Sequence, residues 1–294
     1  MPIPDNNKAK AVTLLILLSL IWGTSFILMK RGLTVFSAGE VGSIRVVAAM
    51  LFLLPLALTK LQDLSGVQYG KLLASGLMGI FIPAFLFAAA QTRMESSVTG
   101  IMNSLTPICT LLIGIFFFGQ AFRSQSLLGI IIGLVGTIIL IFANYGGAIS
   151  GFNSYAFLVI VACLLYGTNL NFIKYNVTEL KALTITSVSI LLISPLALLY
   201  LFGFTEFTTK LSTHPEAWKA LSYLVLLGIM STSVATILFN YLVKISTPLF
   251  TSSVTYLIPI VAVMWGLLDG EKLLPGHFIG MVAIIGGVYL ANRK

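Results

Sequence analysis

Charged side chains are scarce in this sequence. Asp, Glu, Lys and Arg make up 9% of its 294 residues, whereas a soluble protein carries about 25%. Hydrophobic residues account for 58%, and the mean hydropathy is +1.03. Because so few charges cannot cover a water-facing surface, the sequence predicts an all-α polytopic membrane protein.

Acidic and histidine side chains are absent from the middle of the apolar runs. All nine Asp and Glu residues, and both His214 and His277, lie in loops, tails or the ends of runs. Proton-coupled carriers usually keep a carboxylate or a histidine at membrane depth, so the sequence favours facilitated diffusion or exchange. The same absence argues against a drug antiporter that binds cations through a buried Glu.

Catalytic and cofactor-binding patterns are missing as well. An intramembrane enzyme needs His, Asp, Glu, Ser or Cys groups that converge at one depth, and the sequence contains neither His-Glu-x-x-His nor Gly-x-Ser-x-Gly. The two cysteines, Cys109 and Cys163, stand in apolar runs, which is typical of small buried hydrophobic residues. We therefore expect no enzymatic activity, no cofactor and no bound metal.

The 17 Lys and Arg residues give the chain a net charge of +8, but they are scattered over the loops. Nucleic-acid binding requires a basic face, so we expect no nucleic-acid partner. Counted over the loops, ten cations lie on the side of the N-terminus and seven on the other side. Since cytoplasmic loops carry the excess of Lys and Arg, both termini are predicted to be cytoplasmic.

Ten apolar runs follow one another along the chain, each near the roughly 20 residues that a spanning helix needs. Their approximate limits are 11–31, 38–59, 70–91, 96–118, 125–143, 154–174, 182–203, 219–242, 247–268 and 274–291. Most connections are very short, which makes neighbouring helices antiparallel. The sequence predicts ten transmembrane helices.

The first and sixth runs carry the same pattern, because Leu20–Lys30 recurs as Leu164–Lys174. Further matches follow in the same order: Pro55 with Pro195, Pro107 with Pro259, and Gly119-Gln120 with Gly270-Glu271. We therefore predict two five-helix repeats, residues 1–148 and 149–294, that together form one membrane domain. An odd number of helices inverts the second copy. Inverted repeats are typical of secondary transporters, although some channels also have them.

These repeated residues resemble the ten-helix EamA-type transporters of the drug/metabolite transporter superfamily. The resemblance rests on Ile21–Phe26, on Arg45, and on the two proline-containing runs that lead to Gly119-Gln120 and Gly270-Glu271. It implies a multi-pass permease of the bacterial cytoplasmic (inner) membrane, often an exporter of amino acids or other small metabolites. It also implies a central cavity lined by the first, third, fourth, sixth, eighth and ninth helices. Gln120 departs from the Gly-Glu pair usual in the family, which argues against a symmetric role for this carboxylate.

Polar and aromatic side chains at matching depths of both halves are candidates for the cavity wall. Polar groups at membrane depth are costly unless they face protein or water, although Thr and Asn also bond neighbouring helices, and Trp and Tyr also form interface belts. Asn169 and Asn171 are two positions apart, so both cannot face one cavity. The candidate substrate-binding residues are Trp22, Thr24, Phe85, Asn103, Tyr166, Asn169, Asn240, Thr255 and Tyr256.

Prolines and end-lying lysines are candidates for gating. A proline removes a backbone hydrogen bond and frees a carbonyl, so we expect the carrier to rock or to bend at Pro83, Pro107, Pro195 and Pro259. Lys30 and Lys174 close the two repeated helices, where they either snorkel to the headgroups or form a charge pair in a gate. Arg45 is interpreted as a structural anchor rather than as an attractor for an anionic substrate.

The sequence thus predicts a secondary transporter that works by alternating access. Its expected substrate is a small polar metabolite that is uncharged or zwitterionic, such as an amino acid. The alternatives are a channel, a polytopic membrane protein without transport function, and an exporter of a different metabolite or drug class. The expected partners are the substrate and membrane lipid. Glycines spaced at Gly129–Gly133 and Gly276–Gly280 let helices approach closely, and packing within the chain is favoured over dimerisation; monomer and dimer both stay open.

Overall fold

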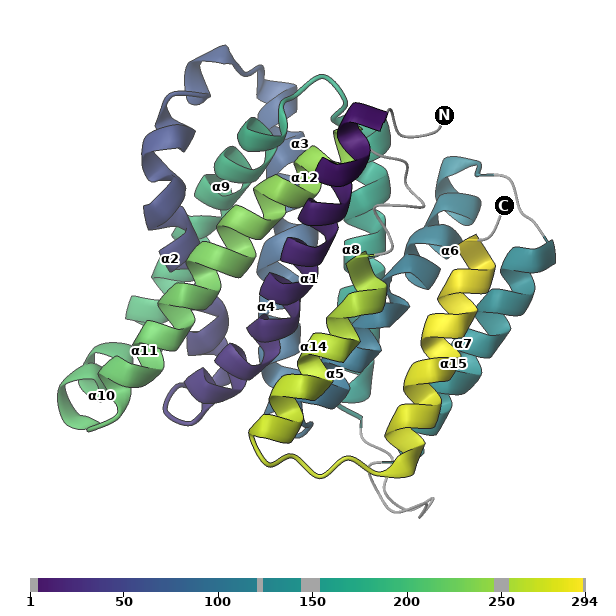
Figure 1. Cartoon of the computed structure of the whole chain (residues 1–294). Coiled ribbons are helices and arrows are strands. Elements are labelled where there is room, and N and C mark those ends of the chain that lie inside the picture. The colour runs from purple at the N-terminus through teal and green to yellow at the C-terminus, as the bar shows by residue number, and fades with distance from the viewer. Residues whose placement is uncertain (1–4, 121–123, 144–153, 246–253, 293–294) are drawn as a thin grey trace.

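The chain folds into helices joined by short turns (Figure 1). The computed structural model describes residues 5–120, 124–143, 154–245 and 254–292, and no β-strand occurs among them. The helices are α1 (Asp5–Leu33), α2 (Ala38–Leu58), α3 (Gly66–Gly76), α4 (Ile82–Gln91), α5 (Ser96–Met102), α6 (Thr106–Phe118), α7 (Ser124–Ala143), α8 (Ala156–Asn176), α9 (Ala182–Gly203), α10 (Phe207–Thr213), α11 (Ala217–Leu226), α12 (Ala235–Ile245), α14 (Val254–Leu268) and α15 (Pro275–Asn292). The expected all-α architecture is confirmed for these residues.

Seven helical segments are long and apolar enough to cross a membrane. They are Ala9–Leu33, Ala38–Leu58, Gly66–Gln91, Ser96–Phe118, Ala156–Asn176, Ala182–Gly203 and Ala217–Leu242. Three further apolar stretches are shorter, namely Leu128–Ile139, Leu257–Leu268 and Pro275–Gly287, which lie within α7, α14 and α15. Each of these segments overlaps one predicted run. The multi-pass architecture is thus confirmed, while the number of ten crossings stays a prediction.

Three of the spanning segments change helix type midway. The third consists of α3, a π-helical turn at Leu77–Phe81 and α4, and the fourth consists of α5, a 3₁₀ turn at Asn103–Leu105 and α6. Pro83 and Pro107 lie at the starts of α4 and α6. A proline lacks the N–H for the i→i−4 bond and its ring clashes with the preceding turn, so that turn widens or tightens. The segment from α11 to α12 contains a second π-helical turn at Leu227–Val234 without a proline.

The helices pack side by side into one bundle, and equivalent helices of the two halves make equivalent contacts. α1 packs on α14 and α8 on α6, α2 packs on α9, and α7 pairs with α15 at one edge of the bundle (Figure 1). α1 begins and α15 finishes at the same end of the molecule, whereas α1 and α8 run in opposite directions (Figure 1). The two helices that share the repeated sequence pattern therefore run in opposite directions within one bundle.

The glycine that recurs in the first and sixth runs allows a close helix–helix contact in both halves. Gly23 of α1 lies against Val261 of α14, and a Cβ at Gly23 would overlap that side chain. Gly167 of α8 lies against the backbone of Cys109 and Thr110 in α6, where a Cβ would come within 2.7 Å of the Thr110 nitrogen. Each glycine therefore lets its helix approach the proline-containing helix of the other half.

α7 and α15 also approach each other through glycines. A Cβ at Gly287 of α15 would come within 2.5 Å of the Gly133 nitrogen and 2.6 Å of the Gly129 carbonyl oxygen in α7. Gly136 of α7 faces the Gly280 carbonyl oxygen of α15 in the same way. The glycine-rich faces thus pack against each other within the chain.

Gly287→Ala is expected to lower the free energy of unfolding by about 1–3 kcal/mol, because the added Cβ meets backbone that cannot rotate away. The neighbouring Gly286 faces open space, so Gly286→Ala is expected to raise the free energy of unfolding by up to about 1 kcal/mol, since it restricts the unfolded chain. The midpoint of thermal unfolding in detergent measures both changes. Equal midpoints for the two variants would contradict the close contact of α7 with α15.

Candidate functional site

A cavity of about 160 Å³ lies in the middle of the bundle, and both halves of the chain contribute to its wall. Its polar side chains are Ser25, Ser75, Asn103, Thr106, Asn169, Thr186, Ser189, Ser231, Thr232, Thr236, Asn240 and Thr255. Its aromatic side chains are Trp22, Phe26, Phe87, Tyr166 and Phe239. Among the described lining residues, Arg45 alone is charged.

The aromatic side chains of the cavity hold one another in place. Trp22 Nε1 donates to the Ser231 carbonyl over 3.1 Å, and the Trp22 ring lies 5.1 Å from the ring of Phe239. Tyr166 stacks on Phe87 with ring centroids 5.9 Å apart. Aromatic pairs at such distances add about 0.5–1.5 kcal/mol beyond the burial of their area. The two aromatic residues that correspond in the repeat therefore form fixed walls of the cavity.

The polar side chains of the cavity differ in whether other protein groups form hydrogen bonds with them. Asn240 donates to Thr186 Oγ1 over 3.0 Å, and Asn103 Oδ1 accepts from Thr106 Oγ1 over 3.3 Å. Asn169 Oδ1, in contrast, is buried and has no hydrogen-bond partner among the described residues. Because a buried polar atom without a partner is costly, Asn169 has capacity to bind a ligand.

Of the nine candidate substrate-binding residues, six line this cavity: Trp22, Asn103, Tyr166, Asn169, Asn240 and Thr255. Thr24 does not, because it lies two positions from Trp22 on another side of α1, where it accepts a hydrogen bond from Trp265 Nε1. Phe85 packs against two other aromatic side chains instead. The side chain of Tyr256 lies outside the described residues.

Sequence reasoning missed the contribution of α2 and α9 to the cavity, and within the eighth run, which was expected to line it, the second π-helical turn was not singled out. Arg45 lies on α2, Thr186 and Ser189 lie on α9, and Ser231 and Thr232 lie in the π-helical turn. Arg45 stands out in the sequence but was interpreted as a structural anchor, and the only signal of the other four is that they are Ser and Thr residues within apolar runs. Such residues also bond to their own or neighbouring helices, so the signal does not identify a cavity.

One end of the bundle carries a group of charged side chains around the end of α1. Lys30 Nζ lies 2.7 Å from Glu271 Oε1, 2.7 Å from Asp269 Oδ2 and 3.4 Å from Glu95 Oε2. Arg31 pairs with Asp269 as well. We call these five residues the charged cluster, which joins the ends of α1 and α14 to the start of α5. Lys30 is therefore ion-paired rather than directed towards lipid headgroups.

Glu271 is the buried centre of the charged cluster, with a side chain that is 0% exposed. Its Oε1 accepts from the Ser96 N–H (3.0 Å) and hydroxyl (2.6 Å), and its Oε2 accepts from the Ser97 N–H (3.0 Å) and hydroxyl. It thereby caps the start of α5, where free N–H groups and the helix dipole favour an anion. Burial alone would raise the pKa of Glu271, but hydrogen bonds from Lys30, Ser96 and Ser97 outweigh burial and hold the pKa at about 2. Glu271 is therefore ionised at neutral pH.

The other end of the bundle carries a neutral counterpart. Gln120 Nε2 donates to Asn171 Oδ1 over 2.9 Å, and Asn171 Nδ2 donates to the Thr110 carbonyl over 2.8 Å. We call these three residues the amide cluster, which joins the ends of α6 and α8. Asn171 thus faces away from the cavity that Asn169 lines, in agreement with their two-residue spacing.

Gln120 and Glu271 reach these positions through similar turns. The preceding Gly119 and Gly270 end their helices with φ values of 63° and 81°, which glycine adopts without strain. In each helix another glycine, more than a turn earlier, leaves the space into which the Gln120 or Glu271 side chain folds back. The Gly-Gln and Gly-Glu pairs therefore turn the backbone alike and differ in charge.

The remaining gating candidates differ in burial. Pro83, Pro107 and Pro259 are buried, whereas Pro195 is exposed on α9. Lys174 is also exposed, and its ammonium lies 5.1 Å from the centre of the ring of its C-terminal neighbour. No ion pair with Lys174 occurs within the described ranges. The lysines at the ends of the two repeated helices are thus not equivalent.

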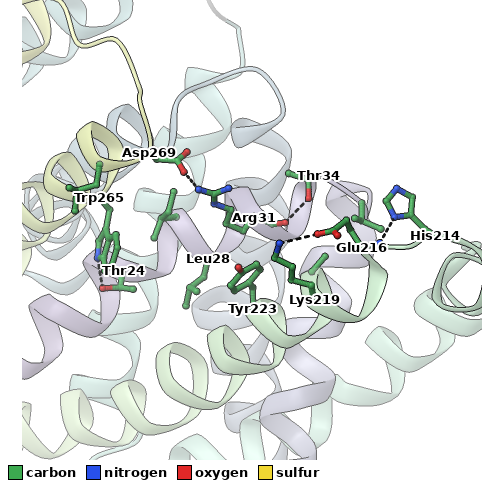
Figure 2. Close-up of a pocket in the computed structure, with 14 residues that line it drawn as sticks. Thr24, Leu28, Arg31, Thr34, His214, Glu216, Lys219, Tyr223, Trp265 and Asp269 are labelled. Carbon is green, nitrogen blue, oxygen red and sulfur yellow. Dashed lines mark hydrogen bonds and ion pairs between the residues drawn. The ribbon is translucent and has the colours of Figure 1, made fainter.

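A second, wider pocket of about 660 Å³ opens beside the charged cluster, between α1, α11 and α14. Figure 2 shows its polar rim, on which Lys219 pairs with Glu216 over 3.1 Å and Arg31 reaches towards α14. Thr24 and Trp265 line the same pocket and share a 2.9 Å hydrogen bond (Figure 2). This pocket shares no lining residue with the central cavity, and Arg31 and Asp269 of the charged cluster belong to its wall, so the two are separate pockets.

Several known proteins are similar to nearly the whole chain. The uncharacterized inner membrane transporter YedA of Escherichia coli strain K12 is 25% identical over 288 residues, which covers 94% of this chain and 88% of YedA. YedA of Escherichia coli O157:H7 matches to the same extent. A protein of known crystal structure is 15% identical and matches with a TM-score of 0.64 over 96% of both chains. At this identity, the structural likeness concerns the fold alone.

Both halves of the chain match one family of transporters. Residues 9–142 match the EamA-like transporter family, and residues 153–293 match the same family again. The resemblance that rested on Ile21–Phe26, Arg45 and the two proline-containing runs is thereby confirmed. The matched family and the relatives are transporters rather than enzymes. This chain belongs to the EamA-like transporter family and is a membrane transporter.

Proposed function

We propose that the protein is a secondary transporter of the bacterial cytoplasmic membrane. It moves a small polar metabolite, of the size and polarity of an amino acid, through the central cavity by alternating access. The observation that carries this proposal is the cavity of about 160 Å³, with polar and aromatic walls drawn from both halves. Pockets for drug-sized ligands measure roughly 300–1,000 Å³, so this cavity favours a smaller molecule and argues against a drug exporter.

The helix arrangement supports ten crossings in two inverted repeats of five helices. Both halves match the same family, equivalent helices make equivalent contacts, and α1 and α8 run in opposite directions (Figure 1). Substrate sites of such transporters lie where the repeats meet, which agrees with the cavity. The name of the E. coli relative supports the inner membrane, and the excess of cations on the side of the termini favours cytoplasmic termini.

The two end clusters act as gates in this scheme. The charged cluster ties α1 to α5 and α14, and the amide cluster ties α6 to α8. If one cluster opens while the other stays closed, the cavity faces one side of the membrane at a time. Bending at Pro83, Pro107, Pro195 and Pro259 allows the helix halves to move, because each proline lacks a backbone hydrogen bond.

Counterflow in proteoliposomes tests the proposal. Vesicles are loaded with the twenty unlabelled L-amino acids, and each labelled amino acid is then supplied outside in a separate assay. At least one labelled amino acid is expected to accumulate in the vesicles, at a rate that saturates with its concentration. Asn103→Ala and Asn169→Ala are each expected to reduce this rate about five- to tenfold, because one hydrogen bond contributes about 1 kcal/mol and more when the partner is charged.

Thr168→Ala is the matched control and is expected to transport like the wild type. Thr168 is next to Asn169, but its hydroxyl donates to the Leu164 carbonyl of its own helix, and it does not line the cavity. Flux without saturation or counterflow would indicate a channel. Full activity in both asparagine variants would contradict the placement of the substrate site.

A further inference from the structure

Arg45 is the cavity residue that the proposed function leaves without a role. Its Nε donates to Thr232 Oγ1 over 2.5 Å, and both residues line the central cavity. Within the described part of the chain, no carboxylate forms an ion pair with Arg45. The described acids that form ion pairs do so with other cations, namely Lys30, Arg31, Lys71, Lys210 and Lys219.

An unpaired guanidinium at this depth is unfavourable for the protein on its own. Moving a charge out of water has a large desolvation cost that only a counter-charge offsets, and charged side chains at membrane depth mark substrate pathways. A guanidinium has five N–H donors in a planar fork. Thr232 accepts from one of them, and the Nη1 and Nη2 donors form no hydrogen bond with a described residue. The side of the fork that matches a carboxylate is therefore free.

Two further atoms of the same cavity are unpartnered. Asn169 Oδ1 and Ser231 Oγ are buried, line the cavity and have no hydrogen-bond partner among the described residues. Tyr166, one turn from Asn169 on α8, lines the same cavity as Arg45. The cavity thus combines an unpaired cation with unfilled hydrogen-bonding capacity, as a site for a polar anionic ligand requires.

We infer that Arg45 binds the carboxylate of the transported substrate, so that the substrate class is small metabolites that carry a carboxylate group. The inference rests on the proposed transport function and narrows its substrate. A carboxylate accepts two parallel N–H groups of a guanidinium and supplies the counter-charge that the described protein residues do not. An amide or ester of the same metabolite leaves the guanidinium unpaired and binds more weakly.

Competition on the wild-type protein tests the inference without any substitution. The counterflow rate of a labelled L-amino acid is measured in the presence of one of three competitors with the same side chain. The competitors are the unlabelled amino acid, its amide, and the carboxylic acid that lacks the amine. The amide is expected to compete at least about tenfold less well than the amino acid, whereas the amine-free acid is expected to compete. Equal competition by the amide would overturn the inference.

A stability measurement separates the role of Arg45 from the identity of the substrate. Acetate, the simplest carboxylate probe, is expected to raise the thermal midpoint of the wild-type protein in detergent, because it binds the folded state. In Arg45→Met this response to acetate is expected to vanish. Without acetate, the midpoint of Arg45→Met is expected to stay level or to rise by about 2–4 °C, since the variant removes an uncompensated charge. The matched control is Arg93→Met, at an exposed arginine between α4 and α5, which is expected to keep the acetate response.

The outcomes distinguish a failure of the proposed transport of amino acids from a failure of the inference about Arg45. Absence of counterflow with all amino acids, together with an acetate response that depends on Arg45, would move the substrate to another class of carboxylate and support the inference. An acetate response that survives in Arg45→Met would overturn the inference, whatever the midpoint of that variant. If Arg45→Met does not fold, the amide competition on the wild type decides.

Discussion

Glu271→Ala is expected to destabilise the end of the bundle that carries the charged cluster by about 3–5 kcal/mol, the usual cost of removing one partner of a buried ion pair. The variant leaves Lys30 without its buried counter-ion, and it leaves the N–H groups of Ser96 and Ser97 without acceptors. Because these contacts join α1 to α5, the proposed closed arrangement of this gate loses stability relative to the proposed open one. We expect a lower midpoint of thermal unfolding in detergent and a lower counterflow rate, since a carrier held open at one end cannot complete its cycle.

The exposed pair of Lys219 and Glu216 provides the control. Its side chains are 64% and 59% exposed at a separation of 3.1 Å, so Glu216→Ala is expected to change the free energy of unfolding by less than about 1 kcal/mol. A double-mutant cycle with Lys30→Met and Glu271→Gln isolates the coupling in the charged cluster, which we expect to reach about 0.5–3 kcal/mol. Equal effects of Glu216→Ala and Glu271→Ala would contradict the role assigned to the cluster.

Acid titration reports on the same contact. The pKa of Glu271 in the folded protein, about 2, lies below its ordinary value of 4.5. The stability that this carboxylate contributes is therefore present above about pH 4.5 and is lost as the pH falls towards about 2. Across this window, the thermal midpoint of the wild type should fall more steeply than that of Glu271→Gln, which has no carboxylate to protonate.

Gly167→Leu is expected to cost about 3 kcal/mol of stability and to abolish counterflow. A Cβ at Gly167 would come within 2.7 Å of the Thr110 nitrogen and 2.9 Å of the Cys109 carbonyl carbon. Both atoms belong to the backbone, so the added side chain has to push α8 away from α6, and overpacking of this kind is destabilising. Separation of these helices also shifts Tyr166 and Asn169 away from the cavity. The yield of monodisperse protein in detergent, the thermal midpoint and counterflow measure the effect.

Gly70→Leu is the corresponding control, because Gly70 of α3 has open space where its Cβ would lie. We expect this variant to fold and to transport like the wild type. Gly23→Leu should resemble Gly167→Leu, since Gly23 contacts α14 as Gly167 contacts α6. Normal transport by Gly167→Leu would show that the repeated glycine does not set the helix spacing.

The fold class was predictable because its cause is local in the sequence. Length and hydropathy of a run decide whether it can span a membrane, and each of the ten apolar helical segments overlaps a predicted run. The break at Asn103–Leu105 accompanies Pro107, whose missing N–H is visible in the sequence. The π-helical turn at Leu227–Val234 has no such mark, and therefore escaped prediction.

The cavity was only partly predictable, because its wall depends on which side of each helix faces inward. Trp22 and Tyr166 correspond in the repeat, and both line the cavity. Thr24 has the same repeat signal, but the rotation of α1 turns it towards Trp265 and the wider pocket. Sequence patterns give the spacing of residues along a helix, whereas the rotation of that helix is set by its packing partners.

The sequence by itself determined that this protein is a multi-pass membrane protein, that its two halves correspond, and that it resembles the EamA-like transporters. These conclusions were possible because composition, run length and repeated residues can be read from the sequence without knowing which distant residues are in contact. Only the tertiary structure decided the roles of the charges. Glu271 is stabilised by Ser96 and Ser97, about 175 residues earlier in the chain, while Arg45 meets Thr232 but no described carboxylate. The role of a charged side chain in a membrane protein depends on the groups that it contacts, and the tertiary structure brings those groups together.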